Sequence, residues 1–134
     1  MNKLLLIPIS LLILPLLLNT CDDKAPEPQC IAMVKVTTYT ISPRQTDATP
    51  TITASGFNVG WKNPKKHRVI AISRDLKQRF KFGSYVRLEG CGKYDGVYRI
   101  EDLMNKRFKN RIDILINPND KPTMFAQAKL YETN

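Results

Sequence analysis

Residues 111–116 read Arg-Ile-Asp-Ile-Leu-Ile, and this short run decides the fold class. Its apolar residues occupy both alternating positions of an extended chain, a pattern typical of a strand that is buried on both faces. Asp113 lies inside the run, where an ionised carboxylate is costly unless it has a partner. The run therefore predicts a buried strand that carries one polar residue of special interest.

Five further runs have the β-branched and aromatic composition of strands, and turn-forming residues separate them. They are residues 33–40, 68–73, 85–89, 96–101 and 126–131. Six short strands in so small a domain would leave exposed edges in an open sheet, and closure removes those edges. We therefore expect a mainly β fold, a closed six-stranded barrel. Short helices are expected at 73–79, 105–108 and 119–125.

Composition limits the classes of protein that fit. The chain has 134 residues, a length that suffices for one small domain. It contains 21 Lys and Arg against 12 Asp and Glu. Recurring apolar runs argue against a disordered chain, and the lack of sustained helical spacing argues against a coiled coil. Residues 62–68 are rich in basic side chains and follow Trp61. In an exported protein, such a run indicates binding to an anionic envelope polymer or to a membrane surface, or a face that keeps the protein in solution. It does not indicate binding to nucleic acid.

The first twenty residues have the pattern of an export signal. An apolar stretch from Leu4 to Leu18 follows Lys3, and as a helix it would be about 22 Å long, too short for a bilayer core of about 30 Å. Leu18-Asn19-Thr20-Cys21 resembles the lipobox of bacterial lipoproteins, in which a peptidase cuts before the cysteine that carries the lipid; the alternative is an ordinary secretory signal cut nearby.

These observations predict three segments. They are a signal peptide over 1–20, a proline-rich tether over 21–30 and a folded domain over 31–134. The expected location is the bacterial cell envelope, with Cys21 as a lipid anchor in the membrane, on the periplasmic side or at the outer membrane.

The chain has three cysteines and a single histidine, His67. If Cys21 is acylated, Cys30 and Cys91 are left as one pair in an oxidising compartment, which favours a disulfide between them. Spacing in the sequence does not establish that the two residues come close enough to bond. No CxxC pair is present, so we predict neither a metal site nor an organic cofactor.

Asp113 is the leading candidate for chemistry, because burial raises the pKa of a carboxyl group, as a general acid near neutral pH requires. A structural role, as an ion pair with Arg111 or Arg99 or as a turn cap, is the plainer alternative. Asp102 shares its alternation with Tyr98 and Ile100, which predicts a place at the end of the core face. A polar side chain at that place either forms a hydrogen bond to a neighbouring loop or points into a cleft. Taken alone, Asp102 is better explained by a structural role.

Residues 102–113 read Asp-Leu-Met-Asn-Lys-Arg-Phe-Lys-Asn-Arg-Ile-Asp. This segment resembles the motif of the 3D domain, a family named for three aspartates and known from membrane-bound lytic transglycosylase A and many small exported proteins. The family motif reads roughly Asp-Thr-Gly-Gly-Ala-Ile-Lys-Gly-Asn-Arg-Ile-Asp. Other family elements are matched in the same order, and the resemblance covers about residues 35–132. The matching segments are Thr38-Tyr39-Thr40, Thr53-Ala54-Ser55-Gly56, Ile70-Ala71-Ile72-Ser73 and Phe82-Gly83-Ser84.

The resemblance implies a double-psi β-barrel, shared with rare lipoprotein A, and cleavage of peptidoglycan glycan strands by a glycosidase of lytic-transglycosylase type. Asp113 matches the catalytic aspartate of the family, and Asp102 matches the assisting one. Tyr39, Thr53 and Asp75 are candidates for holding the glycan. The chain departs from the family at Ser73, where the first aspartate is usual.

Two other functions stay open from the sequence. One is a non-catalytic module that binds cell-wall polysaccharide, because related double-psi barrels bind or loosen polysaccharide without hydrolysis. The other is an accessory protein of the envelope that uses the fold for protein contacts.

Overall fold

The computed structural model describes residues 27–42 and 48–133. The expected signal peptide and the expected lipid-anchor residue Cys21 lie outside these residues. Within the described part, six strands and three short 3-10 helices follow one another along the chain. The strands are β1 (Cys30–Tyr39), β2 (Val69–Ile72), β3 (Tyr85–Glu89), β4 (Gly96–Leu103), β5 (Arg111–Leu115) and β6 (Met124–Glu132). All six strands expected from the sequence are present.

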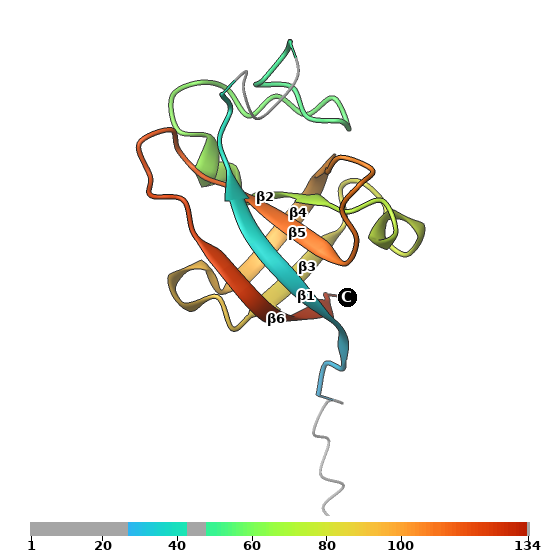
Figure 1. Ribbon diagram of the computed structural model, residues 1–134. Helices are drawn as coiled ribbons and strands as arrows, with labels where there is room; N and C mark the ends of the chain where they lie inside the picture. Colours follow the sequence, from blue (N-terminus) through green and yellow to red (C-terminus); the bar gives the residue numbers. More distant parts are fainter. Residues whose placement is uncertain (1–26, 43–47, 134) are drawn as a thin grey trace, which may run out of the picture.

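The six strands form a closed barrel in the order β1-β5-β2-β4-β3-β6 (Figure 1). β1 runs parallel to β5 and β2 runs parallel to β4. The other neighbouring pairs are antiparallel. The expectation of a mainly β, closed six-stranded barrel is therefore confirmed.

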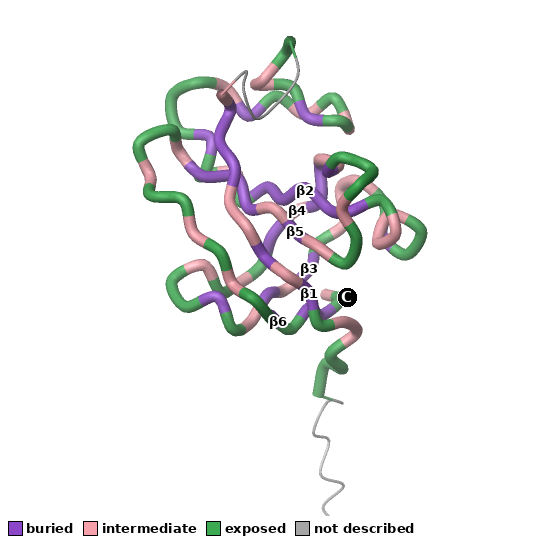
Figure 2. Tube along the Cα trace, viewed as in Figure 1, coloured by how far each residue is buried: buried purple, intermediate pink, exposed green. Residues whose placement is uncertain are grey.

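Alternate residues of every strand fill the barrel interior, because successive side chains of a strand point to opposite faces. Figure 2 shows buried positions alternating along the barrel wall. The largest fully buried side chains of this interior are Ile70, Ile72, Leu88, Ile100, Ile112, Ile114, Ile116 and Leu130. This interior is the main hydrophobic core.

A second hydrophobic cluster lies on the outer side of the barrel wall. Val69, Ala71 and Leu115 of the strands contribute to it, and Val59 and Met104 cover them from two loops. β5 is therefore apolar on both faces, as its sequence predicts: Ile112 and Ile114 belong to the interior, whereas Leu115 belongs to the outer cluster.

The helices differ from the sequence-based expectation. The three 3-10 helices are η1 (Pro64–His67), η2 (Leu76–Gln78) and η3 (Gly92–Tyr94). Only η2 lies where a helix is expected. Residues 105–108 form a turn that Phe108 N closes on Asn105 O. The expectation of a helix at 119–125 is wrong: residues 119–123 are not helical, and Met124 and Phe125 pair with β1 as the beginning of β6.

The expected disulfide between Cys30 and Cys91 is wrong, because both are free cysteines. Cys30 is exposed at the start of β1, whereas Cys91 is fully buried in the core of the barrel. Burial, together with the nearby charge of Asp95, raises the pKa of the Cys91 thiol to about 11. The thiol of Cys91 is therefore protonated and inert at neutral pH.

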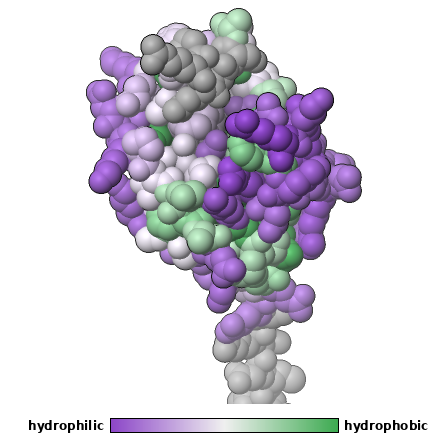
Figure 3. Space-filling model, in the orientation of Figure 1, coloured by the Kyte–Doolittle hydropathy of each residue, from purple (hydrophilic) through white to green (hydrophobic). Residues whose placement is uncertain are grey.

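The surface in view is largely polar. On the face seen in Figure 3, hydrophilic side chains cover most of the molecule and hydrophobic ones gather in small areas. Across residues 27–42 and 48–133 no helix has the length and hydrophobicity needed to cross a bilayer.

Candidate active site

Two aspartates lie in one row across the barrel wall. Asp102 of β4 is opposite Ala71 of β2, Ala71 is opposite Asp113 of β5, and Asp113 is opposite Thr37 of β1. Residues directly opposite each other on neighbouring strands place their side chains on the same face of the sheet. The neighbours Val36, Ile70 and Ile112 belong to the barrel interior, so the row faces outward.

A β-bulge directs Asp102 to this outer face. The register between β2 and β4 shifts after Ile70, which is opposite Ile100, so that Ala71 is opposite Asp102 and Glu101 is the extra residue. An extra residue reverses the alternation of a strand. The expectation that Asp102 shares the core face with Ile100 is therefore wrong, and the bulge explains why.

The outward row forms the base of a groove of about 770 Å³. Residues from the segment at 50–54 and from the loop at 103–108 form its sides, and Ala71 between the two aspartates has too small a side chain to fill it. The groove is lined by Thr38, Tyr39, Pro50, Ile52, Ala54, Ala71, Arg74, Asp102, Leu103, Met104, Asn105, Arg107, Phe108 and Asp113. Both predicted catalytic aspartates and Tyr39 therefore line one groove.

The Asp113 carboxyl is half-buried, and Thr37 Oγ1 donates a hydrogen bond of 2.8 Å to its Oδ1. Burial raises the pKa of Asp113 to about 6; the hydrogen bond from Thr37 and the charge of Arg111 oppose the rise, and the charge of Asp102 adds to it. Such a carboxyl group exchanges its proton close to neutral pH, as a general acid requires.

The alternative of a structural ion pair at Asp113 has little support from the contacts. Arg99 forms its ion pair with Glu101. The guanidinium of Arg111 lies over the ring of Phe108, 4.5 Å from its centroid. The positive charge of Arg111 interacts electrostatically with Asp113 and lowers the pKa of its carboxyl group.

Among the described residues, Tyr39 and two backbone N–H groups donate hydrogen bonds to the Asp102 carboxylate. Its Oδ2 accepts from Tyr39 OH at 3.1 Å, and its Oδ1 accepts from the backbone N–H groups of Ala54 at 3.0 Å and Leu103 at 2.9 Å. Donors of this kind favour the charged form of a carboxylate. Burial, followed by the charge of Asp102, raises the pKa of Tyr39, so Tyr39 stays a neutral donor.

Two arginines give the groove a positive rim. Arg74 and Arg107 both line it, and both are exposed. Neither arginine was predicted from the sequence as a site residue, and Thr37 was not predicted either. The alternation of β1 offered a signal for Thr37, because Thr37 lies two residues before Tyr39 and so shares its face.

Thr53 and Asp75 do not line the groove. Thr53 is buried, and its hydroxyl accepts a hydrogen bond of 3.1 Å from Phe57 N within a turn. Asp75 accepts from Asn110 N at 2.9 Å and so ties the loop before β5 to the end of β2. Burial alone would raise the pKa of Asp75, but hydrogen bonds from Ser73 and the backbone outweigh it and lower the pKa. Both side chains therefore form local hydrogen bonds outside the lining of the groove.

Ser73 is fully buried at the end of β2. Its hydroxyl accepts a hydrogen bond of 3.0 Å from Arg111 N, and its own N–H donates to Arg111 O at 2.9 Å. The side chain of Ser73 thus joins β2 to the first residue of β5, two positions before Asp113.

Metal ligands do not gather in the part of the chain that the structure describes: no three His, Cys, Asp or Glu side chains lie close enough together to hold an ion. No family model matches the chain, and no curated protein is significantly similar to it.

Proposed function

We propose that this protein is an exported glycosidase of lytic-transglycosylase type that acts on peptidoglycan in cell-wall turnover. One observation carries the proposal: the half-buried Asp113 carboxyl, with a pKa of about 6, lies in a groove beside the hydrogen-bonded carboxylate of Asp102. The resemblance of residues 35–132 to the 3D domain supports the same activity, and the resemblance of Cys21 to a lipobox cysteine supports attachment to the membrane.

The proposed reaction uses Asp113 twice. Protonated Asp113 donates its proton to the glycosidic oxygen while the bond from that oxygen to C1 breaks, and the leaving sugar keeps the proton as a hydroxyl group. The Asp113 carboxylate then accepts the proton of the C6 hydroxyl as O6 bonds to C1. The products are a free hydroxyl end and a 1,6-anhydro end, and Asp113 has regained its proton. The two steps consume no water.

Asp102 has a different task in this scheme. Positive charge develops on the sugar ring as the bond to C1 breaks, and a fixed carboxylate stabilises that charge. Hydrogen-bond donors hold Asp102 in place, so it needs no rearrangement when the charge appears. Hydrogen bonding from Tyr39 makes this tyrosine a positioning residue for Asp102.

The rim of the groove fits an anionic glycan. Arg74 and Arg107 are exposed on it, where their guanidinium groups can pair with the carboxylates of peptide-bearing sugars. Ile52 and Phe108 supply apolar surface in the same groove, against which the C–H faces of sugar rings can pack.

Mass spectrometry of the products that the full-length protein, in detergent, releases from purified sacculi tests the proposal. We expect products with anhydro ends from the wild type, and a loss of about 100-fold or more in Asp113→Asn, because general acid–base catalysis contributes about that much. Glu132→Gln, an exposed carboxylate at the end of β6, is the matched control and should keep the wild-type rate.

Two results would change this assignment. Products with reducing ends would mean hydrolysis in place of transglycosylation. Release by Asp113→Asn at the wild-type rate would mean that Asp113 is not the acid.

The second candidate function is a module that binds cell-wall polysaccharide without cleaving it. Ser73 favours it, because this residue stands where the related family has an aspartate and its hydroxyl is already hydrogen-bonded to the chain. Binding of the wild type to sacculi without any released product, equally strong in Asp113→Asn, would support the binding module.

A further inference from the structure

A second pocket, of about 270 Å³, opens at one end of the barrel. β2 begins at this end, just after Lys65 and Arg68, and β5 ends there at Leu115, because the two strands are antiparallel. Ile114 and Ile116, which belong to the core of the barrel, line the pocket too. The mouth of a β-barrel is a common place for a small-molecule site. None of the residues that line this barrel-mouth pocket lines the groove of the two aspartates.

Arg68 is held in this pocket at the cost of backbone strain. Its φ of 49° lies in the left-handed region, which is uncommon for residues other than glycine and concentrates at functional sites. Its Nε donates to Val97 O at 2.8 Å, and its Nη2 donates to Asp95 O at 3.3 Å. The guanidinium lies over the ring of Tyr98, 4.2 Å from the centroid. Several contacts thus fix the position of one cation.

Gly96 makes room for this guanidinium. A Cβ atom at position 96 would lie 2.8 Å from Nη2 of Arg68, closer than such atoms approach each other. The φ of 130° at Gly96 favours glycine in any case, and the missing side chain leaves space for the Arg68 guanidinium beside the start of β4.

The pocket has an excess of positive charge. Lys65 is compensated, since its Nζ lies 3.0 Å from Asp120 Oδ2. The contacts of Arg68 are backbone carbonyls and a tyrosine ring, and Nζ of Lys93 lies 5.1 Å from the centroid of the Tyr94 ring. Lys93 also acts electrostatically on Asp120. The pocket is lined by three cations, Lys65, Arg68 and Lys93, and by one carboxylate, Asp120, so a net charge of two positive remains on its walls.

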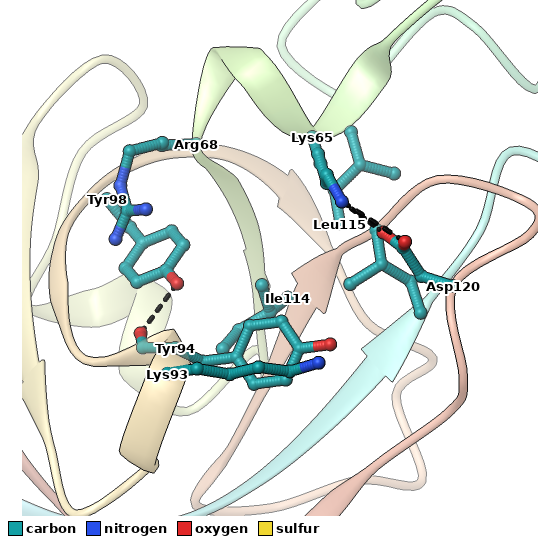
Figure 4. A pocket seen from close by; sticks show the side chains of 9 residues that line it. Lys65, Arg68, Lys93, Tyr94, Tyr98, Ile114, Leu115 and Asp120 are labelled. Carbon is teal, nitrogen blue, oxygen red and sulfur yellow. Dashed lines mark hydrogen bonds and ion pairs between the residues drawn. The ribbon is translucent and has the colours of Figure 1, made fainter.

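Two tyrosines give the pocket flat walls. Tyr98 OH donates to Tyr94 O at 2.6 Å, which fixes the ring of Tyr98. Figure 4 shows the Tyr94 ring with the side chain of Lys93 beside it, and the Lys65–Asp120 ion pair across the pocket from Arg68 and Tyr98. The volume is slightly below the range of about 300–1,000 Å³ typical of drug-sized ligands, so one ring with an anionic group fits it.

We propose that the barrel-mouth pocket binds a monosaccharide-sized organic anion, with the carboxylate or phosphate of the ligand held by Arg68 and Lys93 and its ring placed against Tyr94 and Tyr98. This site goes beyond the glycosidase function and does not depend on it. Carboxylate and phosphate share the chemistry that the two cations recognise, and the choice of probes separates them.

The test is a titration of the ¹⁵N-labelled full-length protein, in detergent, with glucuronate, glucose 6-phosphate and glucose. We expect saturable shifts in the amide signals of Tyr94, Tyr98 and Ile114 with at least one of the two anions, and none with neutral glucose. Binding of glucuronate only would identify a carboxylate ligand, and binding of glucose 6-phosphate only would identify a phosphate ligand.

Substitutions separate the pocket from general surface charge. Arg68→Asn removes the charge while keeping a residue that tolerates a positive φ, and Lys93→Gln removes the second charge at an exposed position. Each should raise the Kd about tenfold or more, because hydrogen bonds to charged groups are among the strongest. Lys66→Gln is the matched control, since Lys66 is an exposed cation of η1 that does not line the pocket.

Three results would overturn the proposal. They are no saturable shift with either anion, equal binding of glucose, and a loss in Lys66→Gln as large as in Lys93→Gln.

Discussion

The two faces of β5 differ in what they do for the protein. The inner face carries Ile112 and Ile114, which are 0% and 2% exposed and pack in the barrel interior. The outer face carries Asp113, half-buried beneath a groove. A small barrel thus separates stability from chemistry: alternate residues fill the core, and a carboxyl group on the other face loses enough water to raise its pKa.

The largest expected effect on stability comes from the inner face. Ile112→Ala should lower the free energy of unfolding by about 2–5 kcal/mol, because it leaves a cavity in a close-packed core. Asp113→Asn, one residue away, should leave that free energy unchanged or raise it at neutral pH. Denaturant unfolding of both variants measures the difference. Equal losses of unfolding free energy in the two variants would contradict the conclusion that the inner face provides stability and the outer face provides the chemistry.

The pH dependence of stability sharpens the same comparison. Because the pKa of Asp113 is raised from 3.8 to about 6 in the folded protein, the folded state binds more protons than the unfolded chain between these values. The free energy of unfolding should therefore fall, on account of Asp113, as the pH rises from about 4 to about 7. We expect about 2 kcal/mol, which is less than the full shift gives, because the carboxyl keeps some solvent contact.

The difference in unfolding free energy between the wild type and Asp113→Asn, followed across this pH range, isolates that contribution. The lowered pKa values of Asp75 and Asp120 act in the opposite direction, since their contributions to stability are lost as the pH falls. They cancel in the difference between the two proteins. A difference that does not change with pH would contradict the raised pKa of Asp113.

A smaller effect is expected at Tyr39 on the outer face. Tyr39→Phe removes the hydrogen bond to Asp102 but keeps the buried ring and the two backbone donors of Asp102. Stability should fall by about 1 kcal/mol, the usual net value of one hydrogen bond. Thermal unfolding checks this, and a loss as large as that of Ile112→Ala would mean that Tyr39 serves mainly the packing of the outer cluster.

The smallest effect is expected at Cys30, which is an exposed free thiol. Cys30→Ser should change the free energy of unfolding by less than about 0.5 kcal/mol, as surface substitutions usually do. Unfolding without reducing agent is the measurement. A loss of about 2–4 kcal/mol in that experiment would indicate that a disulfide with Cys91 does form.

The strands and their closure could be predicted from the sequence, since each strand shows its composition locally and six short strands need closure. The double burial of β5 followed in the same way from residues 111–116. The outward direction of the Asp102 side chain could not be predicted, because the bulge at Glu101 depends on pairing with β2, which is distant in the sequence. The walls of the groove could not be predicted for a similar reason. Arg74 and Arg107 line the groove from loops, and long-range contacts determine the path of those loops.

The cysteines show a second limit. Counting indicates which thiols are available, but whether two of them meet depends on which side of the barrel wall each one faces. Cys91 points into the core while Cys30 lies outside, and the sequence around them carries no signal of this.

The most direct test of the central claim is the pKa of the Asp113 carboxyl, followed by the ¹³C chemical shift of its side-chain carbon in a pH titration, with Asp113→Asn used to assign the signal. We expect a midpoint near pH 6, because burial raises the pKa of this group to about 6. A midpoint close to the ordinary value of 3.8 would contradict it, because Asp113 would then be fully ionised at neutral pH and unable to act as the acid.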